Sequence, residues 1–421
     1  MTVSHIEISL PYGESRMTAR IPRANLAFVL EKQEHEGLKD EYTAITESLR
    51  RPIGSAPLLE RIERNDKVVI IVTDNTRHCP EDRLLPPILA ELEQKIPSDN
   101  ITIIFALGLH PPLDKKAMIK KLGKNIVEKY RVINHDVNNC ANIGVTSRGV
   151  PIDVDNEVLG ADFRISTGFI EPHFFAGFSG GRKSIAPGVF SVRAAYKNHS
   201  RGMLEHPMAR TGILKGNPVH EDMVEQAQAA GLDFIVNVLL NKKGEITHVV
   251  AGDMVEAHEK GCEIERGIAG VRTDRKADIV ITSNSGAPLD LDLYQSVKGM
   301  DTASRVCRKG GIIIICSACC DGAGPVSFVE LHSMAFSPAE VLDLISDDHP
   351  VGVQWQNQIL ARIQVKNDVY VVSDMNGTII KEMMMSPFSS LDAALEQAFT
   401  KLGRDASVAV IPEGPLVMPF E

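Results

Sequence analysis

A glycine-rich segment that carries a histidine, an arginine and a lysine is the first part of this sequence that suggests chemistry. The segment GFIEPHFFAGFSGGRKSIAPG covers residues 168–188 and contains five glycines. Glycine loses much backbone entropy on folding, so such a run indicates a tight turn or a close approach by another molecule. His173 stands beside two phenylalanines that would exclude water from its imidazole, and Lys183 follows the glycines and Arg182. His173 and Lys183 are therefore the first candidates for a site.

Three further stretches place polar groups where they could join this site. DNTRHCP (74–80) offers Asp74, Thr76 and Arg77, whose carboxylate, hydroxyl and guanidinium suit the binding of a phosphate or a carboxylate. LGLHPP (107–112) holds His110 before two prolines, and a general base needs such rigidity. His199, sixteen residues after Lys183, ends a stretch that reads as a helix and could point back at the same cleft.

Each of these residues, taken alone, is more often structural. A single histidine usually serves as a hydrogen-bonded structural group, an Asp-Asn-Thr run often caps a turn, and most lysines are solvated. Their clustering beside a glycine-rich turn favours a binding site.

Two other motifs lie in the second half of the chain. YQSVKG (294–299) places Gln295 and Lys298 three residues apart, so they share a face if a helix begins there. CSACC (316–320) brings three cysteines together after an apolar run, but no second pair has the spacing of a zinc finger. We expect these cysteines to be buried or partly buried thiols.

A phosphate-binding loop is an alternative interpretation of GFSGGRKS (177–184). The P-loop pattern is a glycine, four residues, and then Gly-Lys-Ser or Gly-Lys-Thr. Arg182 stands where the second glycine is required, and EPHFFA is a poor junction between a strand and such a loop. A nucleotide-binding phosphotransferase therefore remains the second hypothesis.

The elements that must position these residues alternate between strands and helices. Strands are expected at 67–74, 101–108, 163–167, 233–240, 278–283, 311–316, 368–373 and 407–411, with amphipathic helical stretches between them. This alternation predicts an α/β fold whose largely parallel sheets are flanked by helices, with binding groups at the carboxyl ends of the strands. A charged stretch at 269–278 marks a boundary between a first domain, 1–270, and a second, 271–421; the extreme C-terminus could pack back on the first.

Composition narrows the class of protein. The chain has 421 residues, a formal net charge of −10 and no basic run with interleaved aromatics, so we expect neither a nucleic-acid nor a membrane partner. The first residues contain no positively charged segment followed by an apolar run, so we expect no signal peptide. The longest apolar run, 312–316, is far too short to cross a membrane. Seven cysteines without a disulfide framework favour a cytoplasmic location.

The motifs together resemble those of one enzyme family. EPHFFAGFSGGRKSIAPG, with DNTR and LGLH upstream and KNH and YQSVKG downstream, closely resembles the nickel-pincer-dependent lactate racemases and their 2-hydroxy-acid racemase and epimerase relatives. The resemblance covers essentially the whole chain. It implies two α/β domains with the active site in the cleft between them, and a cofactor derived from nicotinate whose two sulfur groups and one ring carbon hold nickel.

The resemblance also implies a role for each candidate. Lys183 corresponds to the lysine that binds the cofactor covalently and His199 to the nickel ligand, while His110 and His173 correspond to the paired acid–base histidines. The remaining positions would bind the cofactor (Asp74, Thr76, Gly177, Ser179, Gly180 and Gly181) or the substrate (Arg77, Gln295, Lys298 and Trp355). Removal of hydride from C2 would give a 2-keto acid and avoid a carbanion beside a carboxylate, and cofactor-synthesis proteins would be needed for maturation.

Two departures from the family pattern leave the substrate open. His110 precedes Pro111 and Pro112, where lactate-active relatives often carry an arginine, and Cys79 follows the Asp-Asn-Thr-Arg motif. Lactate, malate, an aromatic hydroxy acid and a sugar acid are the candidate substrates. A nickel-binding or cofactor-handling protein of the same fold, without activity, is a further alternative.

Overall fold

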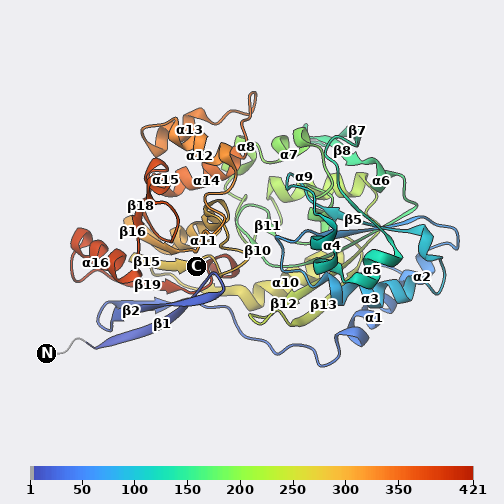
Figure 1. The fold of residues 1–421 in the computed structure, drawn as a ribbon, viewed down its shortest axis with the longest axis horizontal. Coiled ribbons are helices and arrows are strands. Elements are labelled where there is room, and N and C mark those ends of the chain that lie inside the picture. The colour runs from blue at the N-terminus through green and yellow to red at the C-terminus, as the bar shows by residue number, and fades with distance from the viewer. Residues whose placement is uncertain (1–3, 421) are drawn as a thin grey trace. The chain divides into compact units, whose positions relative to one another are not determined.

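The chain forms two compact α/β units (Figure 1). A computed structural model describes residues 4–420. The first unit contains Glu34–His199 and Met203–Ile268, and the second contains Ser200–Gly202, everything from Ala269 onward and the residues up to Gln33. The contacts thus group the N-terminal residues with the C-terminal part of the chain, a grouping that the predicted division at residue 270 does not include.

The first unit is built around a six-stranded sheet in the order β13-β12-β9-β4-β5-β6. Five neighbouring strands are parallel, and β13 pairs with β12 in the antiparallel sense at one edge. The strands are β4 (Val68–Thr73), β5 (Ile101–Ala106), β6 (Arg131–Asn134), β9 (Phe163–Phe169), β12 (Phe234–Leu240) and β13 (Ile246–Gly252).

Helices and small strand pairs surround this sheet. The helices are α1 (Glu41–Arg50), α2 (Leu58–Arg61), α3 (Glu81–Leu92), η1 (Ser98–Asn100), α4 (Lys115–Leu122), α5 (Lys124–Lys129), α6 (Asn156–Leu159), η2 (Gly181–Ser184), α7 (Val192–Asn198), α9 (Pro218–Ala229) and α10 (Glu256–Ala269). Two antiparallel pairs join β7 (Cys140–Val145) to β8 (Pro151–Asp155) and β10 (Pro172–His173) to β11 (Gly177–Phe178). Helix α8 (Arg201–Glu205) follows α7.

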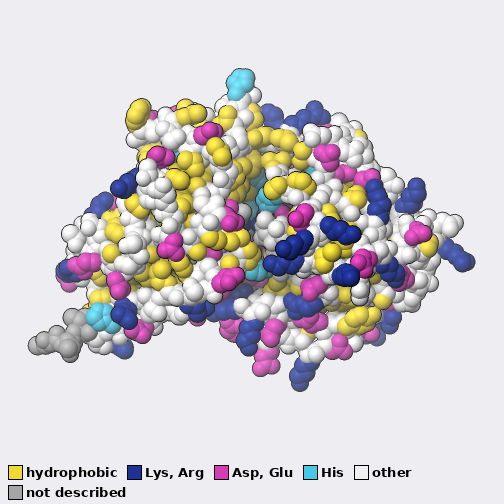
Figure 2. Space-filling model, viewed as in Figure 1, with side chains coloured by type: hydrophobic (Ala, Val, Ile, Leu, Met, Phe, Trp, Pro, Cys, Tyr) yellow, Lys and Arg dark blue, Asp and Glu magenta, His cyan; other side chains and the backbone are white. Residues whose placement is uncertain are grey.

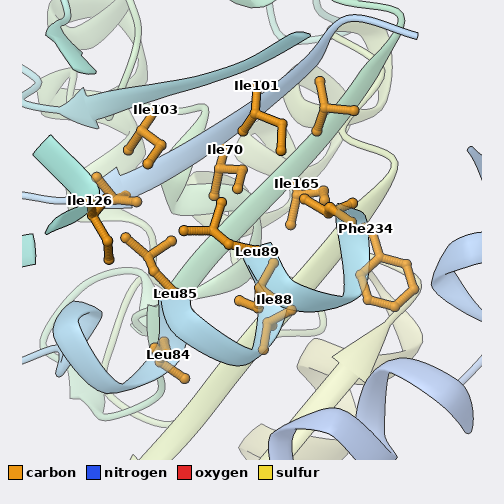
Figure 3. Close-up of a cluster of buried hydrophobic side chains, with 14 of the residues drawn as sticks. Ile70, Leu84, Leu85, Ile88, Leu89, Ile101, Ile103, Ile126, Ile165 and Phe234 are labelled. Atoms are coloured by element: carbon orange, nitrogen blue, oxygen red, sulfur yellow. The ribbon is translucent and has the colours of Figure 1, made fainter. Parts of the chain in front are cut away.

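Apolar side chains on both faces of the central strands make the core of the first unit. The run Val68–Val72 is buried throughout, as expected for a strand with helices on both sides. Helix α3 lays Leu85, Ile88 and Leu89 against Ile70 and its neighbours (Figure 3). This packing fixes the position of the loops that leave the strands.

The order of the strands reverses beside β4. The chain runs from β4 to β5 and β6 on one side, and it then returns to β9 and β12 on the other. In a parallel sheet, ligands bind at the carboxyl ends of the strands where the order reverses. The buried carboxylate of Glu81 ties this point together, because it accepts hydrogen bonds from the backbone N–H and the hydroxyl of Thr73, 2.8 Å each, and from the hydroxyl of Thr167, 2.7 Å.

The second unit contains a six-stranded parallel sheet in the order β18-β17-β16-β15-β19-β3. Its strands are β3 (Leu26–Val29), β15 (Ala277–Ser283), β16 (Cys307–Cys316), β17 (Asp368–Val372), β18 (Ser386–Phe388) and β19 (Val408–Ile411). Its helices are α11 (Leu293–Val306), α12 (Val326–Ser333), α13 (Pro338–Leu344), α14 (Gln354–Gln364), α15 (Gly377–Glu382), α16 (Leu391–Leu402) and η3 (Gly414–Leu416). Strand β14 (Gly270–Arg272) pairs with β20 (Met418–Phe420), so the C-terminal strand stays within this unit.

An N-terminal hairpin completes the core of the second unit. Strands β1 (His5–Tyr12) and β2 (Ser15–Pro22) pair around a turn in which Gly13 has a φ of +53°. Leu10, Ala19 and Ile21 are fully buried in the apolar cluster that β15, β16 and α16 form. The hairpin was absent from the predicted elements, although its alternation of apolar and polar residues is typical of a half-buried strand.

The predicted fold class is confirmed. Each of the eight predicted strands is present, shifted by a few residues at most except at β16, which begins at Cys307. The sheets are largely parallel and the helices lie between the strands in the sequence. Among residues 4–420, no helix is long and apolar enough to span a bilayer. Figure 2 shows acidic and basic side chains intermingled on the visible face.

We predict that Ile70→Ala lowers the free energy of unfolding by about 2–5 kcal/mol, because it leaves a cavity where α3 packs on the sheet. Urea titration followed by circular dichroism measures this change. The control is Val145→Ala in β7, where the side chain is 61% exposed and the expected change is within about 0.5 kcal/mol. Equal losses in the two variants would contradict this assignment of the core.

Candidate functional site

The candidate residues fall into two groups, one in each unit. Asp74, Thr76, Arg77, His110 and the glycine-rich segment lie in the loops after β4, β5 and β9, and His199 directly follows α7. Gln295, Lys298 and Trp355 lie in the second unit, on α11 and α14. Apart from His199, the first group lies in loops at the carboxyl ends of neighbouring parallel strands, as the sequence predicts.

A buried arginine organises the glycine-rich segment. The Arg182 side chain is fully buried, and its guanidinium donates to the carbonyl of Ala176 at 2.7 Å and to that of Gly180 at 3.1 Å. The same group lies 3.0 Å from Nε2 of His258 on α10. Burial lowers the pKa of Arg182 to about 10, which still leaves it charged at neutral pH. A charge held inside the loop by the loop's own carbonyls fixes the loop's shape.

The glycines of this segment are required by neighbouring protein atoms. Gly177 and Gly180 have φ values of +81° and +76°, where side chains are strained. A Cβ at Gly177 would lie 2.3 Å from the carbonyl oxygen of Ile213, and one at Gly180 would lie 2.7 Å from Oδ1 of Asn237. The sequence predicted that another molecule approaches these glycines closely. At Gly177 and Gly180, the atoms that approach belong to the protein itself.

Gly181 and Ser179 are also engaged within the loop. The Gly181 N–H donates to Oδ1 of Asn237 at 2.7 Å, and its φ is +53°. The Ser179 hydroxyl donates to the carbonyl of Phe169 and accepts from the N–H of Glu171, each at 2.9 Å. A role for either residue in cofactor binding stays a prediction.

Lys183 and His173 come together beside an aromatic wall. With Arg182 turned inward, Lys183 of η2 has its Nζ 3.4 Å from Nε2 of His173. The same Nζ lies 5.8 Å from the ring centre of Phe175, whose ring packs against that of His173 with centres 4.5 Å apart. The structure therefore brings two of the candidates within reach of each other.

His199 is a buried neutral imidazole at the end of α7. Its ring lies edge-on to that of Phe175, 5.0 Å between centres, and it is 6% exposed. Burial lowers the pKa of His199 to about 3, so its ring nitrogens are not both protonated at neutral pH. Asn198 anchors the helix end, since its Nδ2 donates to Oδ2 of the buried Asp222 at 2.7 Å. A neutral imidazole held this way is suited to bind a metal ion.

Asp74 and His110 form a pair that joins the loops after β4 and β5. Oδ2 of Asp74 lies 2.5 Å from Nδ1 of His110, and Oδ1 accepts from the hydroxyl and the N–H of Thr76. Burial alone would raise the pKa of Asp74, but the hydrogen bonds from His110 and Thr76 and the charge of Arg77 lower it to about 2. The carboxylate thus holds the proton on Nδ1 of His110 and leaves Nε2 with its lone pair.

Two further contacts hold these loops in place. Nζ of Lys121, on α4, donates to the carbonyls of Arg77 and Cys79 at 2.7 and 2.8 Å. The N–H of Gly108 donates to the carbonyl of Gly188 at 2.8 Å, which joins the loop of His110 to the end of the glycine-rich segment.

In the second unit, α11 and α14 carry the remaining candidates. YQSVKG does open a helix, capped by Asp292, whose side chain accepts from the N–H of Gln295. Gly299 allows this helix to approach β15 closely, because a Cβ there would lie 3.1 Å from the carbonyl oxygen of Ser283. Trp355 donates from Nε1 to the hydroxyl of Tyr294 at 3.0 Å. The Asp292 cap and the Trp355 hydrogen bond orient the first turn of α11.

The P-loop alternative is wrong. GFSGGRKS folds into β11 and a four-residue 3-10 helix, whereas a P-loop leads from a strand into an α-helix. Arg182 fills the interior of the turn where a phosphate would have to lie.

The cysteines are free thiols. Cys316 and Cys319 are buried as predicted, but Cys320 is exposed, so the expectation was wrong for that residue. Cys79 is buried against the core, and burial raises its pKa well above the usual range, which makes it a poor nucleophile. Residues 4–420 contain no group of three or more His, Cys, Asp or Glu side chains placed to hold a metal ion.

Sequence reasoning missed the groups that support the candidates. In the sequence, Arg182 only argued against a P-loop. Asn237 and Lys121 were not among the predicted site residues. Asn237 did give a signal, because it is a polar residue inside the apolar strand β12. Lys121 gave no such signal, because the sequence of an exposed helix does not show whether one of its lysines reaches a neighbouring loop.

Two family models match the chain. The model described as lactate racemase N-terminal domain matches residues 12–212, and the one described as lactate racemase C-terminal domain matches residues 272–418.

Two lactate racemases are similar to the chain over nearly their whole length. The protein from Thermoanaerobacterium thermosaccharolyticum is 38% identical, with 98% of this chain and 99% of that protein covered. The protein from Lactiplantibacillus plantarum is also 38% identical, with 97% and 98% covered.

Two solved structures resemble the fold. The structure of the lactate racemase apoprotein from Thermoanaerobacterium thermosaccharolyticum matches with a TM-score of 0.94 and 38% identity, and it covers 99% of this chain and 100% of that chain. A Thermotoga maritima protein matches with a TM-score of 0.69 and covers 92% of this chain and 99% of that chain. At 18% identity, this second likeness shows the fold alone.

We predict that the folded state loses about 4 kcal/mol of stability between pH 7.5 and pH 5.5 through three buried histidines. Burial lowers the pKa of His199 and His258 to about 3 and that of His220 to about 2. Because their pKa in the unfolded chain is about 6.5, only the unfolded state binds protons as the pH falls below that value. Urea titrations at several pH values measure the slope.

Replacing one of these histidines tests the cause. His258→Gln should reduce the slope by about one third, since one of three groups is gone, whereas His349→Gln, at an exposed position, should leave it unchanged. A stability that stays level from pH 7.5 to pH 5.5 would show that these side chains are not neutral and buried.

Proposed function

This chain belongs to the lactate racemase family and is an isomerase, and we propose that it inverts the C2 centre of a small 2-hydroxy acid, with lactate as the first candidate substrate. The observation that carries the proposal is the 38% identity to two lactate racemases along almost the entire chain. The site in the first unit supports it, because acid–base, amine and imidazole groups gather there at the ends of β4, β5 and β9 and of helix α7.

The residues present fit the nickel-pincer nucleotide that the family resemblance implies. His199 offers a buried neutral imidazole, a ligand that suits nickel together with soft sulfur. Lys183 offers an amine next to the aromatic wall, where a planar ring could lie against Phe175. We propose that Lys183 binds the cofactor covalently and that His199 is the protein ligand of nickel. When bound, the group would supply a reversible acceptor for the hydride of C2.

His110 would serve as the base for one enantiomer. Asp74 holds its Nδ1–H, so Nε2 has the lone pair needed to take the hydroxyl proton as C2 becomes a ketone. The charge that develops on the imidazole is stabilised by the carboxylate behind it, as in other Asp–His pairs. Asp74 is thus a positioning residue that acts through His110.

His173 would serve the opposite enantiomer. Return of hydride to the other face of the planar 2-keto acid needs a proton donor there, and a second histidine can give that proton. Phe175 and Phe174 pack against its ring, which limits the access of water. Arg77 would hold the substrate carboxylate, since a guanidinium group can donate two parallel hydrogen bonds to the two oxygens of a carboxylate. Substrate contacts by Gln295, Lys298 and Trp355, the partnership with cofactor-synthesis proteins and the cytoplasmic location stay predictions.

The test uses protein produced together with cofactor-synthesis enzymes and nickel. Intact mass should show an adduct on the wild type that Lys183→Ala lacks. Loss of optical rotation in a panel of chiral 2-hydroxy acids should identify the substrate. An adduct without racemisation of any panel member would support the non-catalytic alternative instead.

Racemisation in heavy water separates hydride return from proton exchange. If the hydrogen of C2 leaves and returns as hydride, the product should stay largely unlabelled at C2 in the mass spectrum. Deuterium that enters C2 as fast as racemisation proceeds would rule out hydride transfer and favour removal of a proton.

We predict that Asp74→Asn lowers kcat by about 10²–10⁴-fold and changes KM little, because in the proposed mechanism Asp74 acts by holding Nδ1 of His110. The neutral amide can also hydrogen-bond as a donor, which would favour the wrong tautomer of His110. Initial rates of racemisation give kcat and KM. Asp114→Asn, at the N-cap of α4, is the control and should leave both constants unchanged. A change in KM alone would contradict the positioning role.

A further inference from the structure

A cavity of about 530 Å³ lies beside His110, where the neighbouring strands β5 and β6 end. Its wall is made by residues of the loop after β5 (107–112), by the end of β6 and the loop after it (134–137), and by Val192 at the start of α7. All of these residues belong to the first unit. A volume of this size is typical of a site for a small molecule.

Two polar side chains hold the walls of this cavity together. Asn134 donates from Nδ2 to the carbonyl of Leu113 at 2.9 Å and accepts from the N–H of the same residue at 3.1 Å, which ties β6 to the loop after β5. Nδ1 of the buried His135 lies 2.6 Å from Oδ2 of Asp155, and Nε2 lies 2.9 Å from the carbonyl oxygen of Phe190. The loop after β6 is thereby joined to the segment that leads into α7.

The surface that the cavity offers to a ligand is mainly apolar. Leu109 and Val192 are 38% and 39% exposed and both line it. The amide of Asn134 and both ring nitrogens of His135 are already engaged by the protein. Among the described residues that line the cavity none is a lysine or an arginine, and the charged side chain is the exposed carboxylate of Asp136. A ligand would therefore be bound here chiefly by burial of apolar surface.

His110 connects this cavity to the proposed reaction. Its Nδ1 is turned to Asp74, so Nε2 is the ring nitrogen left to take the proton of the substrate hydroxyl. The hydroxyl oxygen is bonded to C2, and the substituent of C2 begins at the next atom. The substituent must then lie close to His110, and the cavity offers it room there.

We propose that this cavity binds the C2 substituent of the substrate, and that this substituent is large and apolar, either a branched alkyl or an aromatic group. The inference rests on the proposed function, because it concerns the same base and the same reaction. The methyl group of lactate is about as large as a water molecule, which takes up about 30 Å³ in the liquid, so lactate would leave most of the cavity unfilled.

The lining also disfavours the more polar candidate substrates. The second carboxylate of malate would meet no cation among the described lining residues, and Asp136 would repel it. The hydroxyl groups of a sugar acid would lose water without new hydrogen bonds to Asn134 or His135, whose polar atoms are already bonded. An alkyl or aromatic group gains free energy by leaving water and loses no hydrogen bond.

Methyl resonances of the cofactor-loaded, full-length protein test where the substituent binds. In protein labelled with carbon-13 at the methyl groups of leucine and valine, racemic 3-phenyllactate should shift the signals of Val137 and Val192. Malate at the same concentration should not. Val326, exposed on α12 of the second unit, is the internal control. Equal shifts with malate, or no shift at Val137 and Val192 with 3-phenyllactate, would overturn the proposal.

Substitutions that fill the cavity test its effect on specificity. In the wild type we expect kcat/KM for 3-phenyllactate to exceed that for lactate by at least about 10-fold. Val192→Phe should remove this preference by lowering the value for 3-phenyllactate, and it should leave that for lactate unchanged. Val137→Phe fills the cavity from the opposite loop and serves if the first variant does not fold. Val145→Phe, exposed on β7 of the same unit, is the matched control and should change neither value.

The results for this proposal and for the proposed function can be told apart. Shifts at Val137 and Val192 without racemisation of any acid would refute the proposed function and leave the cavity as a site for an apolar hydroxy acid. Racemisation of lactate at least as efficient as that of 3-phenyllactate, with equal effects of Val192→Phe on both acids, would refute the inference and leave the proposed function intact.

Discussion

The guanidinium of Arg182 inside its own loop is the interaction on which the candidate site depends. A buried charge is tolerated only when its hydrogen bonds are made, and here the carbonyls of Ala176 and Gly180 make them. The loop must therefore curve around the guanidinium, which requires backbone conformations that glycine alone adopts easily. Because Arg182 turns inward, the next side chain, that of Lys183, turns toward His173.

The second constraint is the reversal of strand order beside β4. Parallel strands place all their carboxyl ends at one edge, so loops separated by nearly a hundred residues in the sequence meet there. Glu81 joins β4 to β9 through two threonines, and the pair of Asp74 and His110 joins the loops after β4 and β5. The acid–base candidates are thus held by the rigid sheet and not by flexible segments.

Burial of neutral histidines is the third common feature, and it opposes stability at low pH. His199, His220 and His258 lie in surroundings that exclude the protonated form, since burial removes the water that would solvate it. A metal ligand must keep a lone pair, so the same burial that weakens the fold in acid suits the role of nickel ligand that we propose for His199. The proposed site thus has a predicted cost, which is lower stability of the fold in acid.

The sequence by itself determined the central strands and many of the helices, because strands such as β4 and β5 and the helix before His199 are specified by local periodicity. The family motif was also readable from neighbouring residues alone, although the sequence did not predict that Lys183 lies in the short 3-10 helix η2. Only the tertiary structure decided which side chains meet: that Asp74 holds His110, that Arg182 is buried, that Asn237 and Ile213 occupy the space beside the glycines, and that the N-terminal hairpin completes the second core. These contacts join residues far apart in the chain. The type and spacing of residues along a single strand or helix do not show which distant group will pack against it. Each of these contacts therefore depends on the folded arrangement.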